Sequence, residues 1–481
     1  AAAMAEADHA DWRATPLITE ADDGTAATTP QPVFDPSDHR RQIGWVTEAT
    51  PAQVDQAVYS AIGAASGWDL TAADERAACL ERAADALEAH LGDFVALCCR
   101  EAGKTVADGI AEVREAADFC RYYAARAREL FGAPMELPGP TGESNRLALH
   151  GRGVFACISP WNFPLAIFTG QIAAALAAGN AVVAKPAEQT PLIAALGTRL
   201  LHEAGIPRDV LHLLPGDGPG VGGPLVADPR IAGVAFAGGL DTARAINRTL
   251  AQRDGPIVPL IAETGGQNAM VVDASALPEQ VVADVLASSF QSAGQRCSAL
   301  RVLYVQEDIA ERLLTMLAGA MAELRIGDPR DLATDVGPVI DAEARDRLAA
   351  HAERMDREAR LIHRCALPSA CDEGTFFAPV AYEIERIEQI GGEVFGPVLH
   401  VIRYPAAELD QVVEAINATG YGLTFGAHSR IDRTIARLTR RVHAGNQYVN
   451  RNMIGAVVGV QPFGGEGLSG TGPKAGGPHY L

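Results

Sequence analysis

The chain has 481 residues, a formal net charge of −20 and 48% hydrophobic residues. At roughly 150 residues per domain, this length predicts two to four domains with ample apolar core. The acidic balance, with no run rich in lysine or arginine, disfavours nucleic acid as a partner. The eight cysteines form no CxxC pair and no cluster with histidine, so we expect neither a disulfide framework nor a metal site, and a reducing cytoplasm fits best.

The first ~130 residues are predicted to be mostly helical. Residues 1–12 lack the basic and apolar segments of a signal peptide, and we expect a frayed lead-in there. Residues 75–104 form the clearest amphipathic helical stretch. Residues 131–153 are rich in glycine and proline around one alternating stretch, which predicts a hairpin that projects from the body.

No charged residue occurs between Arg152 and Lys185, so a membrane span has to be considered. Two prolines, two asparagines, a glutamine and Gly179 interrupt this run. Its pattern divides into a strand, a turn, a helix and a second strand, which favours a buried βαβ unit over a single apolar span.

Apolar strands and helices then alternate along the rest of the chain, in two sets. The first set has strands at 154–159, 181–186, 210–216, 231–239 and 256–266, with helices at 165–179, 191–205 and 240–251. The second has strands at 269–273, 301–306, 397–404 and 422–429, with helices at 278–290, 308–324, 408–419 and 431–442. This alternation predicts two α/β domains with parallel sheets, whose ligands lie beyond the carboxyl ends of the strands.

Three polar residues follow apolar strands of the first set. Asn162, in PWNFP, could cap a helix or donate to a developing oxyanion, and the residue type alone favours the cap. Glu263 could form an ion pair or act as a general base, because partial burial raises the pKa of a carboxyl. Lys185 could form a salt bridge or bind a cofactor at the edge of the sheet.

Cys297 is the cysteine whose surroundings differ from those of the other seven. Free cysteines are mostly inert core residues. Cys297 follows Gln295 and Arg296 in a segment interrupted by glycine, where partial exposure and a nearby positive charge would favour the thiolate. Composition alone leaves both interpretations open.

Two glycine-rich segments are candidates for binding a phosphate. Residues 216–223, GDGPGVGG, follow a strand but do not have the G-x-G-x-x-G spacing. Gly238 and Gly239 lie between a strand and a helix whose N-terminal amides could receive a pyrophosphate. Neither segment is decisive by itself.

Five motifs occur together in one order: PWNFP, AVVAKPAEQTP, AETGGQNA, GQRCSALRV and GGEVFGPVLHV. In order and spacing they resemble the NAD(P)-dependent aldehyde dehydrogenase superfamily, from about Trp12 to the C-terminus. The ending, residues 450–481, resembles the aldehyde dehydrogenase domain of the bifunctional proline utilisation A flavoenzymes. The resemblance implies an α/β aldehyde dehydrogenase fold and NAD-dependent oxidation of L-glutamate γ-semialdehyde, formed from 1-pyrroline-5-carboxylate, in the second step of proline catabolism.

The resemblance also assigns roles to residues. It implies that Cys297 is the nucleophile, Asn162 the amide at the oxyanion and Glu263 the general base. The expected NAD-binding residues are Trp161, Lys185, Glu188, Gly238, Gly239, Glu393 and Phe395, with Lys185 and Glu188 at the adenosine ribose, Glu393 and Phe395 at the nicotinamide ribose. The expected substrate-binding residues are Ser298, Gly455 and Ala456, at the α-carboxylate, and Phe163 and Phe463, beside the aliphatic chain.

One tripeptide departs from the family pattern. Relatives usually have Thr-Gly-Ser where this chain has Ala237, Gly238 and Gly239, so two hydroxyls are missing at the expected pyrophosphate site. Each lost hydrogen bond to a charged group costs about 1.5–3 kcal/mol, and we therefore expect weaker or more mobile NAD binding.

The resemblance divides the chain into three functional parts. Residues 11–133 and 153–263 are expected to form the NAD-binding domain, 264–450 the catalytic domain, and 134–152 with 451–481 a flap and C-terminal segment for homo-oligomerisation. The chain lacks a proline dehydrogenase barrel, so it is expected to be an excised or standalone domain whose parent carries that FAD-containing partner. Two alternatives remain: a non-catalytic structural module of the same fold, and a dehydrogenase for another aldehyde.

Overall fold

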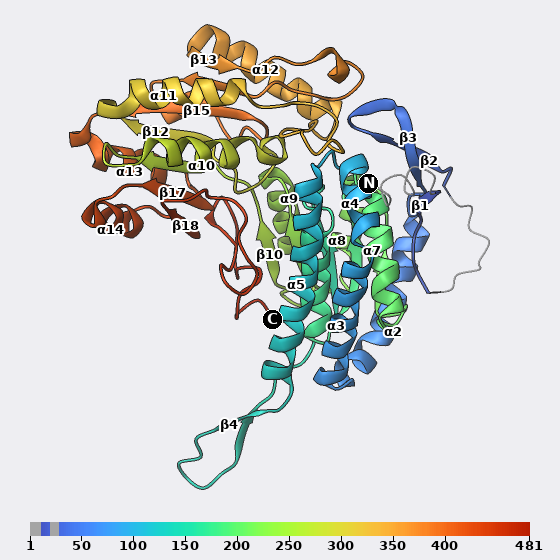
Figure 1. The fold of residues 1–481 in the computed structure, drawn as a ribbon. Helices are drawn as coiled ribbons and strands as arrows, with labels where there is room; N and C mark the ends of the chain where they lie inside the picture. The colour runs from blue at the N-terminus through green and yellow to red at the C-terminus, as the bar shows by residue number, and fades with distance from the viewer. Residues whose placement is uncertain (1–10, 20–27) are drawn as a thin grey trace.

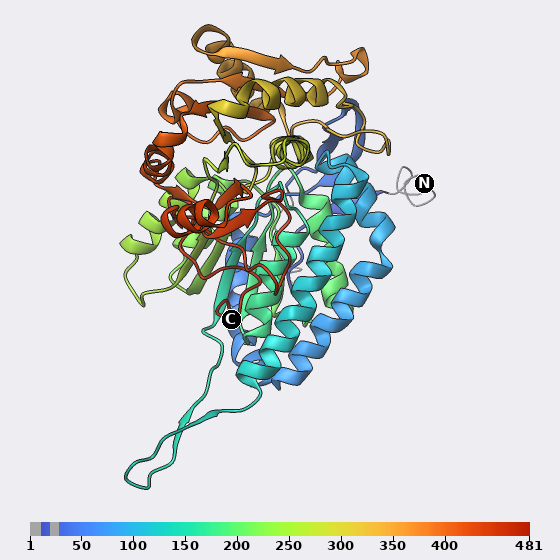
Figure 2. The same ribbon diagram turned by 60° about the vertical axis from the view of Figure 1, so that its left-hand side comes forward.

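The computed structural model describes residues 11–19 and 28–481. The lead-in expected at residues 1–12 therefore lies almost wholly outside the described residues. The described part contains two α/β halves with separate apolar cores, one built from residues between Ala14 and Ala262 and the other from residues between Ala269 and Met453. The two halves lie side by side (Figures 1 and 2).

The first described elements are strands, and the expectation of a mostly helical N-terminus missed them. β1 (Trp12–Ala14), β2 (Gln31–Asp35) and β3 (Asp38–Val46) form a sheet in the order β1-β3-β2. The turn between β2 and β3 has Pro36 at its second position, and the Asp35 carboxylate accepts a hydrogen bond from the Ser37 backbone N–H at 2.8 Å. Proline, aspartate and serine favour turns, so a local signal for this hairpin was present in the sequence.

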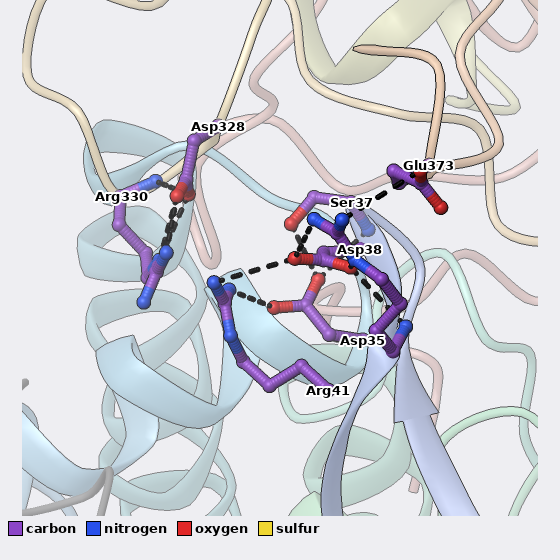
Figure 3. Close-up of polar contacts among 8 residues, drawn as sticks. Asp35, Ser37, Asp38, Arg41, Asp328, Arg330 and Glu373 are labelled. Atoms are coloured by element: carbon purple, nitrogen blue, oxygen red, sulfur yellow. Dashed lines mark hydrogen bonds and ion pairs between the residues drawn. The ribbon is translucent and has the colours of Figure 1, made fainter. Parts of the chain in front are cut away.

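The hairpin turn also joins the two halves of the molecule. Pro36 O accepts from the backbone N–H of Thr375 at 2.8 Å, and Glu373 O accepts from that of His39 at 2.9 Å. Figure 3 shows Arg41 directed at Asp35 and Asp38, with the Asp328–Arg330 pair of the second half beside them. The N-terminal sheet therefore contacts the second half through these hydrogen bonds, at a place outside the cavity described below.

Four helices follow, as predicted for this region: α2 (Pro51–Leu70), α3 (Ala73–Ala89), α4 (Leu91–Glu101) and α5 (Val106–Phe131). α3 packs on α5, and α5 packs on α6 (Ala166–Ala177). These helices form one flank of the first half (Figure 2).

The first large sheet is parallel throughout, with strand order β10-β9-β6-β7-β8. Its strands are β6 (Val154–Ile158), β7 (Ala181–Lys185), β8 (Leu211–Leu213), β9 (Ile231–Ala237) and β10 (Leu260–Glu263). Helices α6, α7 (Pro191–Glu203), α8 (Gly223–Ala227) and α9 (Leu240–Gln252) connect them. The uncharged run 153–184 is therefore the predicted βαβ unit, and none of the described helices is long and apolar enough to cross a bilayer.

The second large sheet has the order β13-β14-β15-β12-β11-β17-β18, and only β13 runs antiparallel. Its strands are β11 (Ala269–Val272), β12 (Val302–Gln306), β13 (Arg360–Arg364), β14 (Val380–Glu383), β15 (Val398–Tyr404), β17 (Thr424–His428) and β18 (Asn446–Val449). Its helices are α10 (Pro278–Phe290), α11 (Glu307–Ala322), α12 (Ala342–Glu358), α13 (Leu409–Ala418) and α14 (Asp432–Arg441). The sequence pattern had not predicted α12, β13, β14 or β18.

A hairpin and the C-terminal segment complete the fold. β4 (Met135–Leu137) and β5 (Asn145–Leu147) pair in the hairpin, which projects away from the body in Figures 1 and 2. Beyond β18, the chain forms a second small pairing of β16 (Tyr421–Gly422) with β19 (Glu466–Gly467). It then returns to the first half, where Tyr480 and Leu481 pack on the first core.

Candidate active site

A cavity of about 740 Å³ is lined by residues from both halves, among them Asn162, Glu263 and Cys297. This volume is in the range of small-molecule and cofactor sites. The three residues proposed to carry the chemistry therefore line one cavity, although they are far apart in the sequence.

The first sheet supplies its contribution from the carboxyl ends of three adjacent strands. Asn162 follows β6, Gly238 and Gly239 follow β9, and Glu263 ends β10. The order β10-β9-β6 makes these strands neighbours, and all four residues line the cavity. This is where an open parallel sheet is expected to bind its ligands.

The second sheet supplies Cys297 from the opposite edge. The residue lies between α10 and β12, in a loop that begins with left-handed backbone at Ser292, Ala293 and Gly294 (φ 53°, 52° and 65°). A Cβ at Gly294 would lie 2.3 Å from Gly396 O, so a side chain is excluded at that position. Non-glycine residues in left-handed conformation store strain and occur preferentially at functional sites.

Two buried side chains hold this loop in place. The Asn268 amide donates to Cys297 O at 2.6 Å and to Ala299 O at 2.9 Å. The Arg301 side chain, which is fully buried, donates to the carbonyl oxygens of Gly294 (2.7 Å), Gly396 (3.0 Å) and Arg296 (3.0 Å). The position of Cys297 is thus fixed by groups that do not themselves line the cavity.

The environment of Cys297 corrects one expectation. The side chain is partly exposed to the cavity, as predicted, but burial by the surrounding protein and the nearby Glu393 and Glu263 carboxyls raise its pKa to about 12. The adjacent Arg296 does not offset this, because its guanidinium pairs with Asp108 at 2.8 Å. The predicted nearby positive charge is present in the buried Arg301 guanidinium, which is coupled to the thiol, but neither this charge nor the Ser298 backbone N–H offsets the effect of burial on the pKa.

Asn162 and Glu263 flank the same space. The Asn162 amide donates to Gln295 O at 3.1 Å, which places it beside the loop of Cys297. One Glu263 oxygen accepts from the Gly465 backbone N–H at 3.1 Å, whereas the other is buried with no hydrogen-bond partner among the described residues. Burial raises the pKa of Glu263 to about 8.

The residues expected at the nicotinamide end also line the cavity. Trp161 and Phe395 meet edge to face with ring centroids 5.5 Å apart, and the Arg301 guanidinium lies 5.2 Å from the Phe395 centroid. One Glu393 oxygen accepts from the Gly266 backbone N–H at 3.0 Å. A Cβ at Gly265 would lie 1.9 Å from the other oxygen, so glycine is needed beside this carboxylate.

The start of α9 suits a diphosphate. Its N-cap residue, Gly239, provides no side-chain cap, and a Cβ there would meet no atom within 4 Å. At Gly238, by contrast, a Cβ would lie 2.7 Å from the Phe236 ring. The free amides of a helix N-terminus next to an open space fit an anionic group, so the residues present are compatible with a dinucleotide.

Lys185 and Glu188 are not among the residues that line this cavity. Lys185 is 4% exposed at the end of β7, where its ammonium donates to Pro186 O at 2.9 Å and lies 3.6 Å from the Glu188 carboxylate. Burial lowers the pKa of Lys185. The structure places this pair at the same carboxyl edge of the sheet, two strands from β9 in the order β9-β6-β7.

The expected substrate residues form the remaining wall. Ser298, Gly455, Ala456, Phe163 and Phe463 all line the cavity. Gly455 has a φ of 70°, and a Cβ there would meet no atom within 4 Å, so its backbone is open to a ligand. Two cations stand over the Phe163 ring, Lys104 at 4.5 Å and Arg296 at 5.4 Å.

Sequence reasoning did not find Glu115, which also lines the cavity. It lies on the face of α5 that carries Asp108 and Glu112, at helical spacing of four and three residues. Asp108 pairs with Arg296 and Glu112 with Lys104, whereas burial raises the pKa of Glu115 to about 8. An acidic stripe on the buried face of this helix was the available signal.

Comparison with known proteins places this arrangement in a family. The model of the aldehyde dehydrogenase family matches residues 23–481. The chain is 54% identical over 478 residues to the bifunctional protein PutA of Klebsiella aerogenes, a match that covers 98% of this chain and 35% of the relative. The chain thus spans about a third of the length of that relative.

Solved structures agree with this. A crystal structure of Bradyrhizobium japonicum proline utilization A, mutant D779W, is 61% identical with a TM-score of 0.88, over 90% of this chain and 44% of that one. The 1-pyrroline-5-carboxylate dehydrogenase of Thermus thermophilus, R100A mutant, is 34% identical with a TM-score of 0.93, over 100% of this chain and 93% of that one. By family match and by fold, the chain belongs to the aldehyde dehydrogenase family.

Proposed function

We propose that this chain oxidises L-glutamate γ-semialdehyde, the open form of 1-pyrroline-5-carboxylate, to L-glutamate with NAD. The observation that carries the proposal is the meeting of Cys297, Asn162 and Glu263 at one cavity. The names of the relatives support the choice of substrate: a 1-pyrroline-5-carboxylate dehydrogenase matches nearly end to end, and the PutA relatives match along most of this chain.

In this proposal Cys297 forms the covalent bond to the substrate. Its thiol gives up its proton to water in the cavity, its sulfur adds to the aldehyde carbon, and the charge that develops on oxygen is received by the Asn162 amide and the Cys297 backbone N–H. The bound oxidised dinucleotide supplies the hydride acceptor and a cationic ring. Loss of hydride from the same carbon leaves a thioester on Cys297.

Glu263 acts in the second half of the reaction. Its carboxylate takes a proton from water while the water oxygen attacks the thioester carbon. The carbon–sulfur bond breaks, its electron pair stays on sulfur, and the product leaves as a carboxylic acid that ionises. The proton that Glu263 took from water can then pass to sulfur, because the pKa of Cys297, about 12, exceeds the pKa of Glu263, about 8.

The residues that would hold NAD come from both sheets. Gly238, Gly239 and the α9 amides would bind the pyrophosphate, and Glu393 and Phe395 the nicotinamide ribose. Lys185 and Glu188 would bind the adenosine ribose. Glu188 would repel a 2′-phosphate, which favours NAD over NADP.

The substrate would lie between Phe163 and Phe463, with its carboxylate at Ser298 and the amides of Gly455 and Ala456. By the same reasoning, the first half is the NAD-binding domain and the second the catalytic domain. The hairpin and C-terminal segment would form a homo-oligomer, and the longer relatives suggest a parent that also carries a proline dehydrogenase domain.

The test is formation of reduced dinucleotide from pyrroline-5-carboxylate and NAD, for the unchanged protein and for Cys297→Ala. Cys371→Ala is the matched control, because Cys371 is a buried cysteine of the second core. We expect activity that Cys297→Ala abolishes and Cys371→Ala leaves intact. Oxidation of other aldehydes but not of this one would refute the substrate, and binding without any turnover would favour a structural module.

A further inference from the structure

Lysine is rare in this chain and concentrated near the cavity. Only three of its 40 basic residues are lysines: Lys104, Lys185 and Lys474. Lys104 stands over Phe163 at the cavity wall, and Lys185 ends the strand β7. The proposed function gives Lys474 no role.

Lys474 belongs to a segment that encloses Glu263. In this segment, residues 463–475, Phe463 and Ala475 pair across its two ends, and Gly465 donates to the Glu263 carboxylate. A Cβ at Gly464 would lie 2.7 Å from one Glu263 oxygen, and a Cβ at Gly470 3.0 Å from the other. The backbone of the segment therefore lies close against both oxygens of the carboxylate.

The side chain of Lys474 runs beside this enclosure. The same Cβ position at Gly464 that lies 2.7 Å from the Glu263 oxygen lies 3.1 Å from both Cα and Cγ of Lys474. The ammonium is anchored, because it donates to the carbonyl oxygen of Gly445. It forms no direct ion pair with Glu263 among the contacts of the described residues, so it acts on the carboxylate through space.

The charges that act on Glu263 are few. Among the described residues, the titratable groups coupled to it are the Cys297 thiol, the Tyr480 hydroxyl and the Lys474 ammonium. Thiol and hydroxyl can only be neutral or negative, so Lys474 is the one cation of the three. Its charge lowers the pKa of Glu263 against the larger opposing effect of burial.

We propose that Lys474 is a positioning residue for the hydrolytic step, the cation that lets the buried Glu263 carboxyl give up its proton and accept one from water. The inference rests on the thioester hydrolysis described under Proposed function. It goes beyond that proposal by making the rate of this step depend on one lysine of the C-terminal segment.

The test compares Lys474→Met, which keeps the stem and removes the charge, with Lys474→Arg, which keeps the charge. The probe is p-nitrophenyl acetate, an activated ester that acylates Cys297 without hydride transfer, so the measurement needs neither dinucleotide nor semialdehyde. The burst of p-nitrophenol reports acylation, and the steady state that follows reports hydrolysis of the acetyl thioester across a pH series.

In Lys474→Met, we expect the acidic limb of the pH–rate profile for hydrolysis to move to higher pH by about half a unit to one unit. The reason is that a nearby opposite charge stabilises the ionised carboxyl, and this variant lacks it. At pH values below the limb, hydrolysis by this variant should be about three- to tenfold slower than hydrolysis by the unchanged protein, which is the same pKa shift expressed as a change in rate. The burst amplitude stays unchanged, which also shows that the variant is folded. Lys474→Arg follows the unchanged protein, and so does Arg433→Met, which removes an exposed cation on α14.

Three results would overturn the inference. A Lys474→Met limb that coincides with that of the unchanged protein would exclude an electrostatic role. A reduced burst with an unmoved limb, or equal defects in Lys474→Met and Lys474→Arg, would show that the side chain only supports the fold. If the unchanged protein showed no Cys297-dependent ester hydrolysis at all, the thioester mechanism would fall first, and this inference with it.

Discussion

The two α/β halves build the cavity from opposite edges of their sheets. In the first half, Asn162 and Gly238 follow the carboxyl ends of adjacent strands and Glu263 ends a third, so that the strand ladder fixes the backbone from which they start. In the second, Cys297 and Glu393 precede β12 and β15, on loops held by the buried side chains of other residues. The rule that ligands lie beyond the carboxyl ends of parallel strands thus describes one half of this site only.

The two halves of the site therefore position their reactive groups in different ways. The hydrogen bonds of the sheet fix the backbone of a residue at a strand end. A residue on a strained loop needs dedicated partners, here Asn268 and Arg301. Substitutions that touch no substrate should therefore damage the second half of the site more than the first.

The largest effect is expected from substitution of the general base, Glu263, which lies in the first half. Glu263→Gln should reduce steady-state turnover on the order of 10²–10⁴-fold, the usual contribution of general-base catalysis, while a first-turnover burst of reduced dinucleotide remains. The pKa of Glu263 is raised from 4.5 to about 8, so the base is protonated below that pH and turnover of the unchanged protein should rise through pH 8. Stopped-flow absorbance across pH measures both, and loss of the burst together with turnover would assign Glu263 to the first step instead.

The next largest loss of activity is expected from Asn162→Ala. Removal of one oxyanion donor costs about 10²–10³ in kcat. Because the amide also donates to Gln295 O, the variant Asn162→Asp serves as a control that keeps the size but removes the donor. Steady-state kinetics that spared both variants would remove Asn162 from the reaction.

Asn268→Leu tests the second half directly. It removes the donors to Cys297 O and Ala299 O, and a displacement of about 1 Å at a reacting group can cost 10²-fold in rate. The matched change for the first half is Thr471→Val in the C-terminal segment, which removes the acceptor of the Ala262 backbone N–H in β10 and should change kcat only about twofold to threefold, because strand pairing remains. Equal losses of kcat in the two variants would contradict the proposed difference between the two halves of the site.

The smallest effect concerns the start of α9. Gly239→Ser should tighten NAD binding about tenfold, because a restored hydroxyl gains a hydrogen bond to a charged group. The backbone there (φ −72°) accepts a side chain, and exchange of glycine for serine at an N-cap alters stability by only a few tenths of a kcal/mol. Isothermal titration with NAD decides this, and equal dissociation constants for the two proteins would contradict it.

Much of this fold could be predicted from the sequence, because apolar strands such as Val154–Ile158 and Ala269–Val272 alternate with helices that end at glycines. The edge strand Arg360–Arg364 was missed because its exposed, charged residues give no apolar run. The catalytic residues were found through family motifs, not through periodicity. Glu115 and Lys474 were not found, since their role depends on which distant carboxylates and cations the fold leaves unpaired.

The central claim is that Cys297 carries the substrate as a thioester that Glu263 then hydrolyses. The most direct measurement is mass spectrometry of peptides from Glu263→Gln after acid quenching with pyrroline-5-carboxylate and NAD. The account predicts a glutamyl acyl group on the peptide that contains Cys297 and on no other cysteine peptide. No adduct despite formation of reduced dinucleotide, or an adduct at another residue, would contradict it.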